Sequence, residues 1–468
     1  MFIVVLTIVV LLFVLLVQLD TRSVAAVSSE AIGATRGSFD DRNGMPLLFT
    51  RLIAGRPSRV SVFPDLDTLL GYRDSRGAWH GLESRYGSLL DARAARQDWR
   101  TVLLHLSGHA ARGGSVRLTL DMRLQAAAER ALGKHLGAIV AIDPRTGGVL
   151  AMATRPACSS VTLASGAGES RCRKRPDSPL LNRATQLIVP PGSSFKIVTL
   201  SAAFDTGRFT LDSIFSGADV FGPSPYFDNV EYPSNVTRTD LVQLTLAQAL
   251  AFSDNFTFAH IGLTLGSDTL LRYAHRFGVG RHIPFDLPLK SSIVADGQLH
   301  PDLSVLARSS FGGSPDRVSP LQMALIASAV ANRGVLMAPH LVQETLSASG
   351  HVLTRYRTHP MGRVMSEQAA REVTTWMVFV VDHGSGFPAQ IPGVEVAGKT
   401  GTAVSGGARA NAWFIAFAPA RQPVVAVAVL RQFSGEGFKF AAPLAHQVLL
   451  AALREHSLQM KPSPAPKR

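Results

Sequence analysis

Hydrophobic and polar positions change their spacing several times along the chain, and each change marks an expected element. The first nineteen residues, MFIVVLTIVVLLFVLLVQL, carry no charge. A run of that length can cross a hydrocarbon core of about 30 Å, so the pattern predicts a transmembrane anchor over residues 1–19. A cleaved signal peptide is the competing interpretation, because small residues that suit cleavage follow in TRSVAAVSS. We favour the anchor, since the apolar part of a signal peptide usually spans only about 7–15 residues.

The next part of the chain, residues 20–114, has few long periodic stretches and is rich in Gly, Arg and Asp. We expect a small module of short elements there. Regular spacing begins at residue 115. Asp121 can cap a helix that follows it, and GAIVAIDPRTGGVLAMAT contains two β-rich runs on either side of a turn. The second pattern predicts a β-hairpin.

Helical patterns dominate the middle of the chain, from Ser193 to about Met377, and β-rich runs return in GVEVAGKTGTA, NAWFIAFAPA and VVAVAVLRQF. Five strands from the two ends of residues 115–456 would therefore form one antiparallel sheet. We predict an α+β fold with helices on both faces of that sheet and a helical subdomain inserted between its strands. Residues 457–468 are Pro- and Lys-rich, which predicts a disordered tail.

The composition bounds the size and the partners of the protein. The chain has 468 residues, of which 46% are hydrophobic, enough for two or three domains of roughly 100–200 residues each. Its formal net charge is +13, but the basic residues are scattered, and no basic run interleaved with aromatics indicates nucleic-acid binding. A basic surface that faces an anionic membrane or cell-wall polymer fits this charge as well.

Cysteine and histidine give little sign of a metal or cofactor. Cys158 and Cys172 are the two cysteines, close enough in sequence for a small disulfide loop in an oxidising compartment, and two unpaired structural thiols remain an open alternative. The histidines are dispersed and show no HExxH or comparable spacing. We therefore expect no metal site and no cofactor.

A candidate reaction centre lies where a Pro-Pro-Gly turn leads into an apolar helix that carries Ser193 and Lys196. A serine hydroxyl is a weak nucleophile until a base takes its proton. Residues three apart share one face of a helix, so the Lys196 amine is expected to reach the Ser193 hydroxyl. The exposed N–H groups of the helix N-terminus favour negative charge there. A helix start that carries both residues by accident would show the same spacing.

Two further short motifs follow in order. Ser253, Asp254 and Asn255 form SDN just after a predicted helix, and residues 399–402 form KTGT at the end of a predicted strand. Either alone is a weak signal, because Ser-Asp-Asn is most often a turn or a helix cap. Together, SxxK, SDN and KTG are the motif set of serine β-lactamases and penicillin-binding proteins.

On these motifs the chain resembles the transpeptidase domain of penicillin-binding proteins over about residues 115–456. LTLDMRLQAAAERAL, GAIVAIDPRTGGVLAMAT, LNRATQLIVPPGSSFK and SPLQMALIASAVANRG extend the similarity. RGSFDDRNG and GLESRYGSLL are similar to parts of the pedestal of class B members, and the region is too short for the glycosyltransferase domain of class A members. The resemblance implies the penicillin-binding, serine β-lactamase-like fold of a monofunctional class B protein, with a pedestal-like module at 20–114. Its single span would lie in a bacterial cytoplasmic membrane, with the catalytic domain in the periplasm or outside.

The resemblance also implies the catalytic roles. Ser193 would attack the penultimate D-Ala of a peptidoglycan stem peptide, and a neighbouring amine would resolve the acyl-enzyme. Lys196 would be the general base once burial and the charge of Lys399 lower its pKa from about 10.4. Ser253 would relay a proton to the leaving amine. The backbone N–H groups of Ser193 and Thr402 would form the oxyanion hole.

Substrate binding is assigned in the same way. Asn255 would hold the peptide backbone of the substrate. Lys399, Thr400 and Thr402 would bind its terminal carboxylate, and Gly401 would let the ligand approach the strand closely.

The implied partners are peptidoglycan stem peptides, β-lactam antibiotics and a polytopic membrane glycosyltransferase of the shape, elongation, division and sporulation family. Three alternatives use the same motifs: a carboxypeptidase or endopeptidase, in which water is the acceptor, a serine β-lactamase, and a non-catalytic β-lactam receptor or scaffold. The large size, the anchor and the pedestal argue against a β-lactamase. The choice between transfer and hydrolysis stays open.

Overall fold

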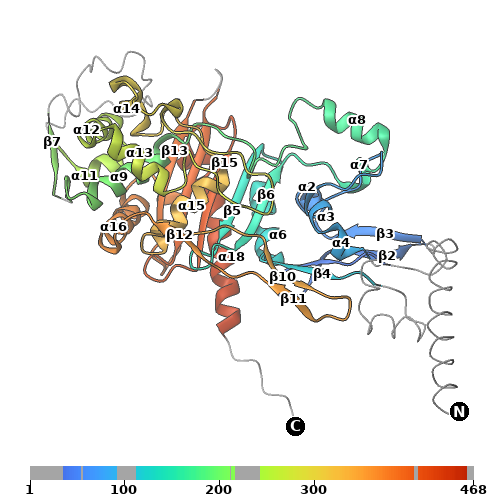
Figure 1. The fold of residues 1–468 in the computed structure, drawn as a ribbon. Helices are drawn as coiled ribbons and strands as arrows, with labels where there is room; N and C mark the ends of the chain where they lie inside the picture. The colour runs from blue at the N-terminus through green and yellow to red at the C-terminus, as the bar shows by residue number, and fades with distance from the viewer. Residues whose placement is uncertain are drawn as a thin grey trace, which may run out of the picture.

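The computed structural model describes residues 35–53, 56–91, 112–210, 212–216, 243–404 and 409–460. The expected anchor at residues 1–19 lies outside these ranges. Among the described residues, every helix is too short or too polar to span a bilayer. A five-stranded sheet stands at the centre of the molecule, with a group of helices on one side and a six-stranded sheet on the other (Figure 1).

The five-stranded sheet is antiparallel throughout, in the order β13–β14–β15–β5–β6. The hairpin β5–β6 comes from the start of the region expected to be catalytic and the other strands from its end, which confirms the predicted sheet. Apart from β13, which carries Lys399, Thr400 and Thr402, its strands are largely apolar because helices cover both faces. The strands are β5 (Gly137–Ile142), β6 (Val149–Arg155), β13 (Ala397–Ala403), β14 (Asn411–Ala418) and β15 (Val425–Arg431).

Side chains of this sheet point alternately into two separate cores, as the two-residue period of a strand requires. On one face Trp413, Ile415 and Phe417 pack with α15, every residue of which is buried. On the other face Phe414 and Ala416 pack with α6 and α18. The predicted helices on both faces are therefore confirmed. They are α6 (Met122–Leu132), α15 (Pro320–Ala331) and α18 (Ala442–Met460).

The ends of α6 and α18 can be compared with the sequence-based boundaries. Asp121 caps α6, as predicted, and accepts hydrogen bonds from the N–H groups of Arg123 and Leu124. Such a cap is worth about 1 kcal/mol. Helix α18 runs to Met460, so the boundary expected after residue 456 falls inside it.

The helical subdomain lies beside the edge strand β13 (Figure 1). A 3₁₀ turn, η3, leads into its first helix, α9, and α16 packs against both β13 and α9. Helices α11 and α12 are joined by a tight loop. The predicted helical insertion is confirmed, although short strands interrupt it. The elements are η3 (Gly192–Phe195), α9 (Lys196–Asp205), β7 (Ile214–Ser216), β8 (Gln243–Thr245), α11 (Leu246–Ala251), α12 (Asn255–Leu265), α13 (Ser267–Arg276), η4 (Ala295–Gly297), α14 (Leu303–Ser309), α16 (Glu367–His383) and η5 (Phe387–Ala389).

The six-stranded sheet, in the order β11–β10–β4–β1–β2–β3, joins segments that are far apart in the chain. β4 pairs with β1 on one side and with β10 on the other. The domain boundary expected at residue 114 therefore falls at the start of β4, inside this sheet. Each buried backbone N–H and C=O group needs a hydrogen-bond partner, and the partner strand can come from a distant part of the chain. The local pattern of hydrophobic and polar residues does not show which strand that is. The strands are β1 (Phe39–Asp40), β2 (Pro46–Ile53), β3 (Arg56–Ser61), β4 (Ser115–Leu118), β10 (Val342–Leu346) and β11 (Val352–Arg355), and a separate pair is β9 (Val335–Met337) with β12 (Pro360–Arg363).

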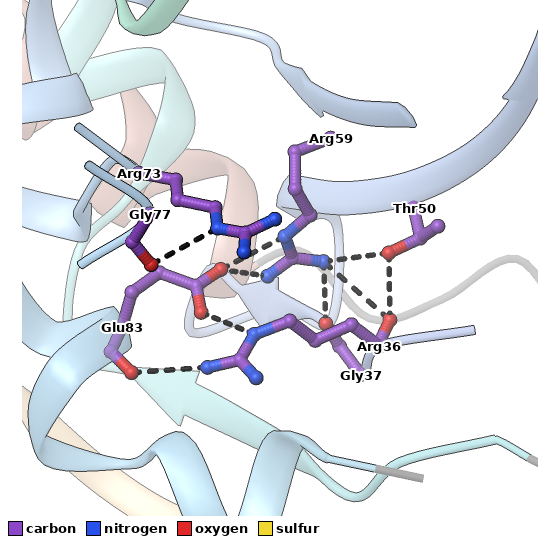
Figure 2. Close-up of polar contacts among 7 residues, drawn as sticks. All are labelled: Arg36, Gly37, Thr50, Arg59, Arg73, Gly77 and Glu83. Carbon is purple, nitrogen blue, oxygen red and sulfur yellow. Dashed lines mark hydrogen bonds and ion pairs between the residues drawn. The ribbon is translucent and has the colours of Figure 1, made fainter. Parts of the chain in front are cut away.

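A buried carboxylate holds together the N-terminal module, for which we expected a pedestal-like structure. Glu83, fully buried on α3 (Gly81–Arg85), accepts from Arg36 Nε at 2.6 Å and from Arg59 Nε at 2.8 Å (Figure 2). Arg59 also donates to the Gly37 carbonyl oxygen at 2.6 Å and to the Thr50 hydroxyl at 3.1 Å. The segments RGSFDDRNG and GLESRYGSLL therefore meet at this cluster. Short helices η1 (Pro64–Leu66), α2 (Asp67–Leu70) and α4 (Gly87–Leu90) complete the module.

Cys158 and Cys172 form a disulfide, which decides between the two alternatives that the sequence left open. The residues between them form α7 (Ser160–Leu163) and α8 (Gly166–Lys174). The two cysteines pack with Tyr72 and Leu163 in a small core of their own.

We predict that Glu83→Gln destabilises the protein by about 3 kcal/mol, because loss of one partner leaves the charge of Arg36 and Arg59 uncompensated in a largely buried site. The measurement is the urea midpoint of unfolding, followed by tryptophan fluorescence. Glu372→Gln, at a partly exposed position of α16, is the matched control. Equal midpoints for the two variants would contradict the structural role of Glu83.

Candidate active site

The turn that carries Ser193 is fixed against the central sheet. Buried Trp413 on β14 donates from its indole N–H to the Pro190 carbonyl oxygen at 2.9 Å. Ser193 lies on η3, and α9 begins only at Lys196. The serine is therefore on a 3₁₀ turn rather than in the first α-helical turn, an arrangement that is frequent at helix N-termini. Ser193 is half-buried, whereas Lys196 is fully buried.

Three glycines allow this turn to pack closely against its neighbours. Gly192 has a φ of +57°, and its N–H donates to the Gly312 carbonyl oxygen at 2.9 Å. A Cβ on Gly312 would stand 2.2 Å from the Gly192 carbonyl oxygen, and one on Gly401 would stand 2.5 Å from that of Pro191. We expected Gly401 to admit a ligand. In the structure it admits the backbone of the turn that carries the serine.

The Lys196 amine is directed at the SDN loop. Its Nζ donates to the Ser253 carbonyl oxygen and to Asn255 Oδ1, each at 2.7 Å, and lies 3.4 Å from the Ser253 hydroxyl oxygen. Among the described contacts, no hydrogen bond joins Lys196 to Ser193. A neutral amine has two N–H donors, and the two carbonyl oxygens can accept both. The lone pair of the Lys196 nitrogen then remains available to accept a proton from a hydroxyl group.

The SDN loop joins α11 to α12 and is held by its own middle residue. Asp254 caps α12 and accepts from the Thr257 N–H at 2.7 Å. Ser253 adopts a φ of +61°, which is uncommon for a residue other than glycine. Asn255 is the first residue of α12 and faces Lys196. The loop therefore presents a hydroxyl and a carboxamide to the Lys196 amine.

The KTGT strand supplies a second amine to the same point. Lys399, fully buried on the edge strand β13, donates to the Ser253 hydroxyl at 2.9 Å and to the Thr400 carbonyl oxygen at 3.1 Å. Thr402 is exposed, and its hydroxyl accepts from the N–H of Gly437 on α17 (Gly437–Phe440) at 3.1 Å. The structure thus brings the three motifs together around Ser253.

One residue of this site was missed by sequence reasoning. The hydroxyls of Ser385 and Thr400 are 2.7 Å apart and hydrogen-bonded, and the Ser385 N–H donates to the Ala251 carbonyl oxygen at 3.3 Å. Ser385 lies between α16 and η5 and so links the KTGT strand to the end of α11. The one signal in the sequence was a Gly-Ser-Gly break shortly before the strand.

Burial determines the protonation of the two lysines. It lowers the pKa of Lys196 well below its ordinary value, and the positive charge of Lys399 lowers it further, while Asp254 acts in the opposite direction. Burial also lowers the pKa of Lys399, to about 7. Taking an ammonium group out of water disfavours its charged form. The site therefore holds an amine that is ready to accept a proton.

Taken together, a half-buried serine, two buried amines and a hydroxyl that both amines contact define a serine acyl-transfer site. Residues 137–450 match the family described as the penicillin binding protein transpeptidase domain. The chain is 31% identical to the peptidoglycan D,D-transpeptidase PbpA of Mycolicibacterium smegmatis and 32% identical to PbpA of Mycobacterium tuberculosis, with 88% of each chain covered.

Solved structures give the same result. Penicillin-binding protein A of M. tuberculosis, solved as an imipenem acyl-enzyme, superposes with a TM-score of 0.83 at 31% identity over 90% of this chain and 98% of that one. Pseudomonas aeruginosa PBP2 gives 0.75 at 26% identity over 93% and 99%. The protein belongs to the penicillin-binding protein transpeptidase family, and the resemblance to its class B members is confirmed.

We predict that acylation of Ser193 by a fluorescent penicillin accelerates as the pH rises. The neutral form of Lys196 must accept the proton, and its lowered pKa places this rise well below about 10.4, where lysine ordinarily titrates. Lys399→Ala removes a neighbouring positive charge, so Lys196 should keep its proton to higher pH. The midpoint of the pH–rate curve then moves upward, and an unmoved midpoint would show that the two amines are not coupled.

A second prediction concerns Ser385. Ser385→Ala removes one hydrogen bond from Thr400, a loss of about 0.5–1.5 kcal/mol, and should lower the second-order rate of penicillin acylation roughly three- to tenfold. Ser385→Thr keeps the hydroxyl and should restore most of the rate. Ser170→Ala, at an exposed position of α8, is the control. If Ser385→Ala acylates at the wild-type rate, the bond has no part in binding.

Proposed function

We infer that this protein is a peptidoglycan D,D-transpeptidase that binds penicillin and works through a serine acyl-enzyme. Membership of the family supports this, as do relatives that bear that name over 88% of this chain. The observation that carries the inference is the convergence of two fully buried lysines on the Ser253 hydroxyl, next to the turn of Ser193.

The acylation step needs one proton acceptor and one proton donor. Ser193 Oγ attacks the carbonyl carbon of the penultimate D-Ala while its proton passes to the lone pair of Lys196. The adduct then expels the terminal D-Ala. Its C–N bond breaks, and the leaving amine takes a proton through the Ser253 hydroxyl. An ester on Ser193 remains. An amine of a neighbouring stem peptide attacks this ester, forms the new peptide bond and restores the proton to Ser193.

The remaining roles concern binding and charge. Asn255 holds the substrate backbone, and Lys399 with the hydroxyls of Thr400 and Thr402 binds the terminal carboxylate. The N–H groups of Ser193 and Thr402 stabilise the oxyanion, and each such donor is worth roughly 10²–10³ in rate. In support, a Cβ on the residue before Ser193 would stand 2.8 Å from the Thr402 nitrogen, so this amide borders the serine turn.

Transfer rather than hydrolysis is the favoured outcome of the second step. A hydrolase of this type needs a base to activate water beside the ester. The SDN motif contains one carboxylate, Asp254, that could be considered for this role. Asp254 is already engaged, because it accepts a hydrogen bond as the cap of α12. The relatives at 31% and 32% identity bear the transpeptidase name, which supports an amine as the acceptor.

We further propose that residues 1–19 anchor the protein in the cytoplasmic membrane, with the catalytic region outside. The support is the uncharged N-terminal run and the disulfide, which indicates an oxidising compartment. A polytopic glycosyltransferase of the shape, elongation, division and sporulation family would supply the glycan strands. The resemblance to class B members is what supports this partner.

The central test is labelling by fluorescent penicillin. Ser193→Ala should abolish the label, and Lys196→Ala should slow it by about 10²–10⁴ because it lacks the general base. Ser194→Ala is the matched control, since its buried hydroxyl already donates to the Pro191 carbonyl oxygen at 2.7 Å. A folded wild type that stays unlabelled, or a label that survives Ser193→Ala, would refute the acyl-enzyme. With lipid-linked substrate and a D-amino acid acceptor, exchange should exceed net hydrolysis.

A further inference from the structure

A group of cations lies on the disulfide-bonded segment after β6, at the opposite edge of the central sheet from β13 (Figure 1). The five-stranded sheet is about 19 Å across at the usual strand spacing, so this group is separate from the active site. We call it the basic lobe, which comprises α8 with its C-cap and the neighbouring pedestal loop. Its cations, all exposed, are Arg73, Arg76, Arg171, Arg173, Lys174 and Arg175.

The carboxylates of the lobe are already engaged. Glu169 accepts from Arg173 Nη2 at 2.7 Å and from the Ser75 hydroxyl at 2.6 Å. Asp177 accepts from Arg175 at 2.6 Å. Asp74 contacts His80 at 2.9 Å. Within the part of the chain that the structure describes, the remaining cations have no carboxylate partner. They are Arg73, Arg76, Arg171 and Lys174.

The backbone beneath these cations is held from three sides. Cys172 joins α8 to Cys158 through the disulfide and packs with Tyr72. Ser165 caps α8 by accepting from the Gly168 N–H at 3.1 Å. The N–H and hydroxyl of Ser75 both donate to Glu169, at 3.2 and 2.6 Å, and tie the pedestal loop to the helix. A ligand would therefore meet cations on a preorganised surface, which lowers the entropic cost of binding.

We propose that the basic lobe binds a polyanionic cell-wall polymer through its repeated phosphate or carboxylate groups. Guanidinium groups match the planar, two-oxygen geometry of both anions. A membrane surface fits less well, because interfacial helices bury an apolar face in the lipid, and the exposed positions of α8 are Gly, Ala, Ser, Arg and Lys. The choice of a wall polymer rests on the extracytoplasmic location proposed above.

The protein would then bind the cell wall at a second place, in addition to the substrate bound at the active site. Binding at the lobe would hold the catalytic cleft near further stem peptides of the same wall and raise their effective concentration. Such binding should weaken as salt rises, since exposed charges are screened over about 10 Å at 0.1 M ionic strength.

The test compares two charge-reversed double variants of the full-length protein. Arg171→Glu with Lys174→Glu alters the lobe, and Arg272→Glu with Arg281→Glu makes the same change of charge at exposed positions in and after α13. Fluorescence anisotropy with labelled inorganic polyphosphate, and co-sedimentation with uncross-linked peptidoglycan, distinguish phosphate from carboxylate sources. The lobe variant should bind at least about tenfold more weakly, because each reversal turns an attraction for the polyanion into a repulsion, and the control should match the wild type.

Three outcomes would overturn the proposal. The first is equal loss in both variants, which would reflect net charge alone. The second is wild-type binding by the lobe variant. The third is binding to phosphatidylglycerol vesicles without binding to either polymer, which would make the lobe a lipid contact. Penicillin labelling is measured on the wild type and on every variant. A wild type that binds the polymers but is not labelled by penicillin would refute the proposed function and leave the proposal for the lobe standing.

Discussion

Two buried lysine amines both contact the hydroxyl of Ser253, and the fold of the active site allows the two amines to lie this close together. An unpaired ammonium group in a protein interior is costly, so each amine must hydrogen-bond and tend toward its neutral form. Lys196 does so with Ser253 and Asn255, and Lys399 with Ser253 and Thr400. Burial lowers both pKa values, and the positive charge of Lys399 lowers that of Lys196 further. Packing therefore favours the neutral, basic form of Lys196, which follows directly after the turn that carries Ser193.

This arrangement requires three backbone segments to approach more closely than side chains ordinarily allow. The serine turn, the loop after α14 and the edge strand β13 meet at Gly192, Gly312 and Gly401, where a Cβ on any of them would stand 2.2–2.5 Å from a neighbouring carbonyl oxygen. The close approach puts Thr402 beside the serine turn. The same contacts explain why these positions are glycine without reference to a ligand.

The rest of the molecule fixes the central sheet from its far edge. Asp65 pairs with Arg155 at the end of β6 at 2.7 Å, and Asp67 accepts from the Ser160 N–H at 2.5 Å. The N-terminal module, which contains Glu83, is thereby joined to the sheet and to the disulfide-bonded segment. The edge of the central sheet at β13 therefore carries the active site. The edge at β6 contacts the N-terminal module and the segment that carries the basic lobe.

The sequence by itself determined the antiparallel sheet, the covering helices, the cap of α6 and the motif residues around the reaction centre. These follow from local periodicity and from residue types that chemistry requires at fixed spacing. Only the tertiary structure decided that β10 pairs with β4, that Cys158 and Cys172 are bridged, that Ser385 supports Thr400, and that Lys196 turns to Ser253 and Asn255. Each of these contacts depends on which distant segments meet when the chain buries its apolar surface. The local sequence pattern does not determine which segments those are.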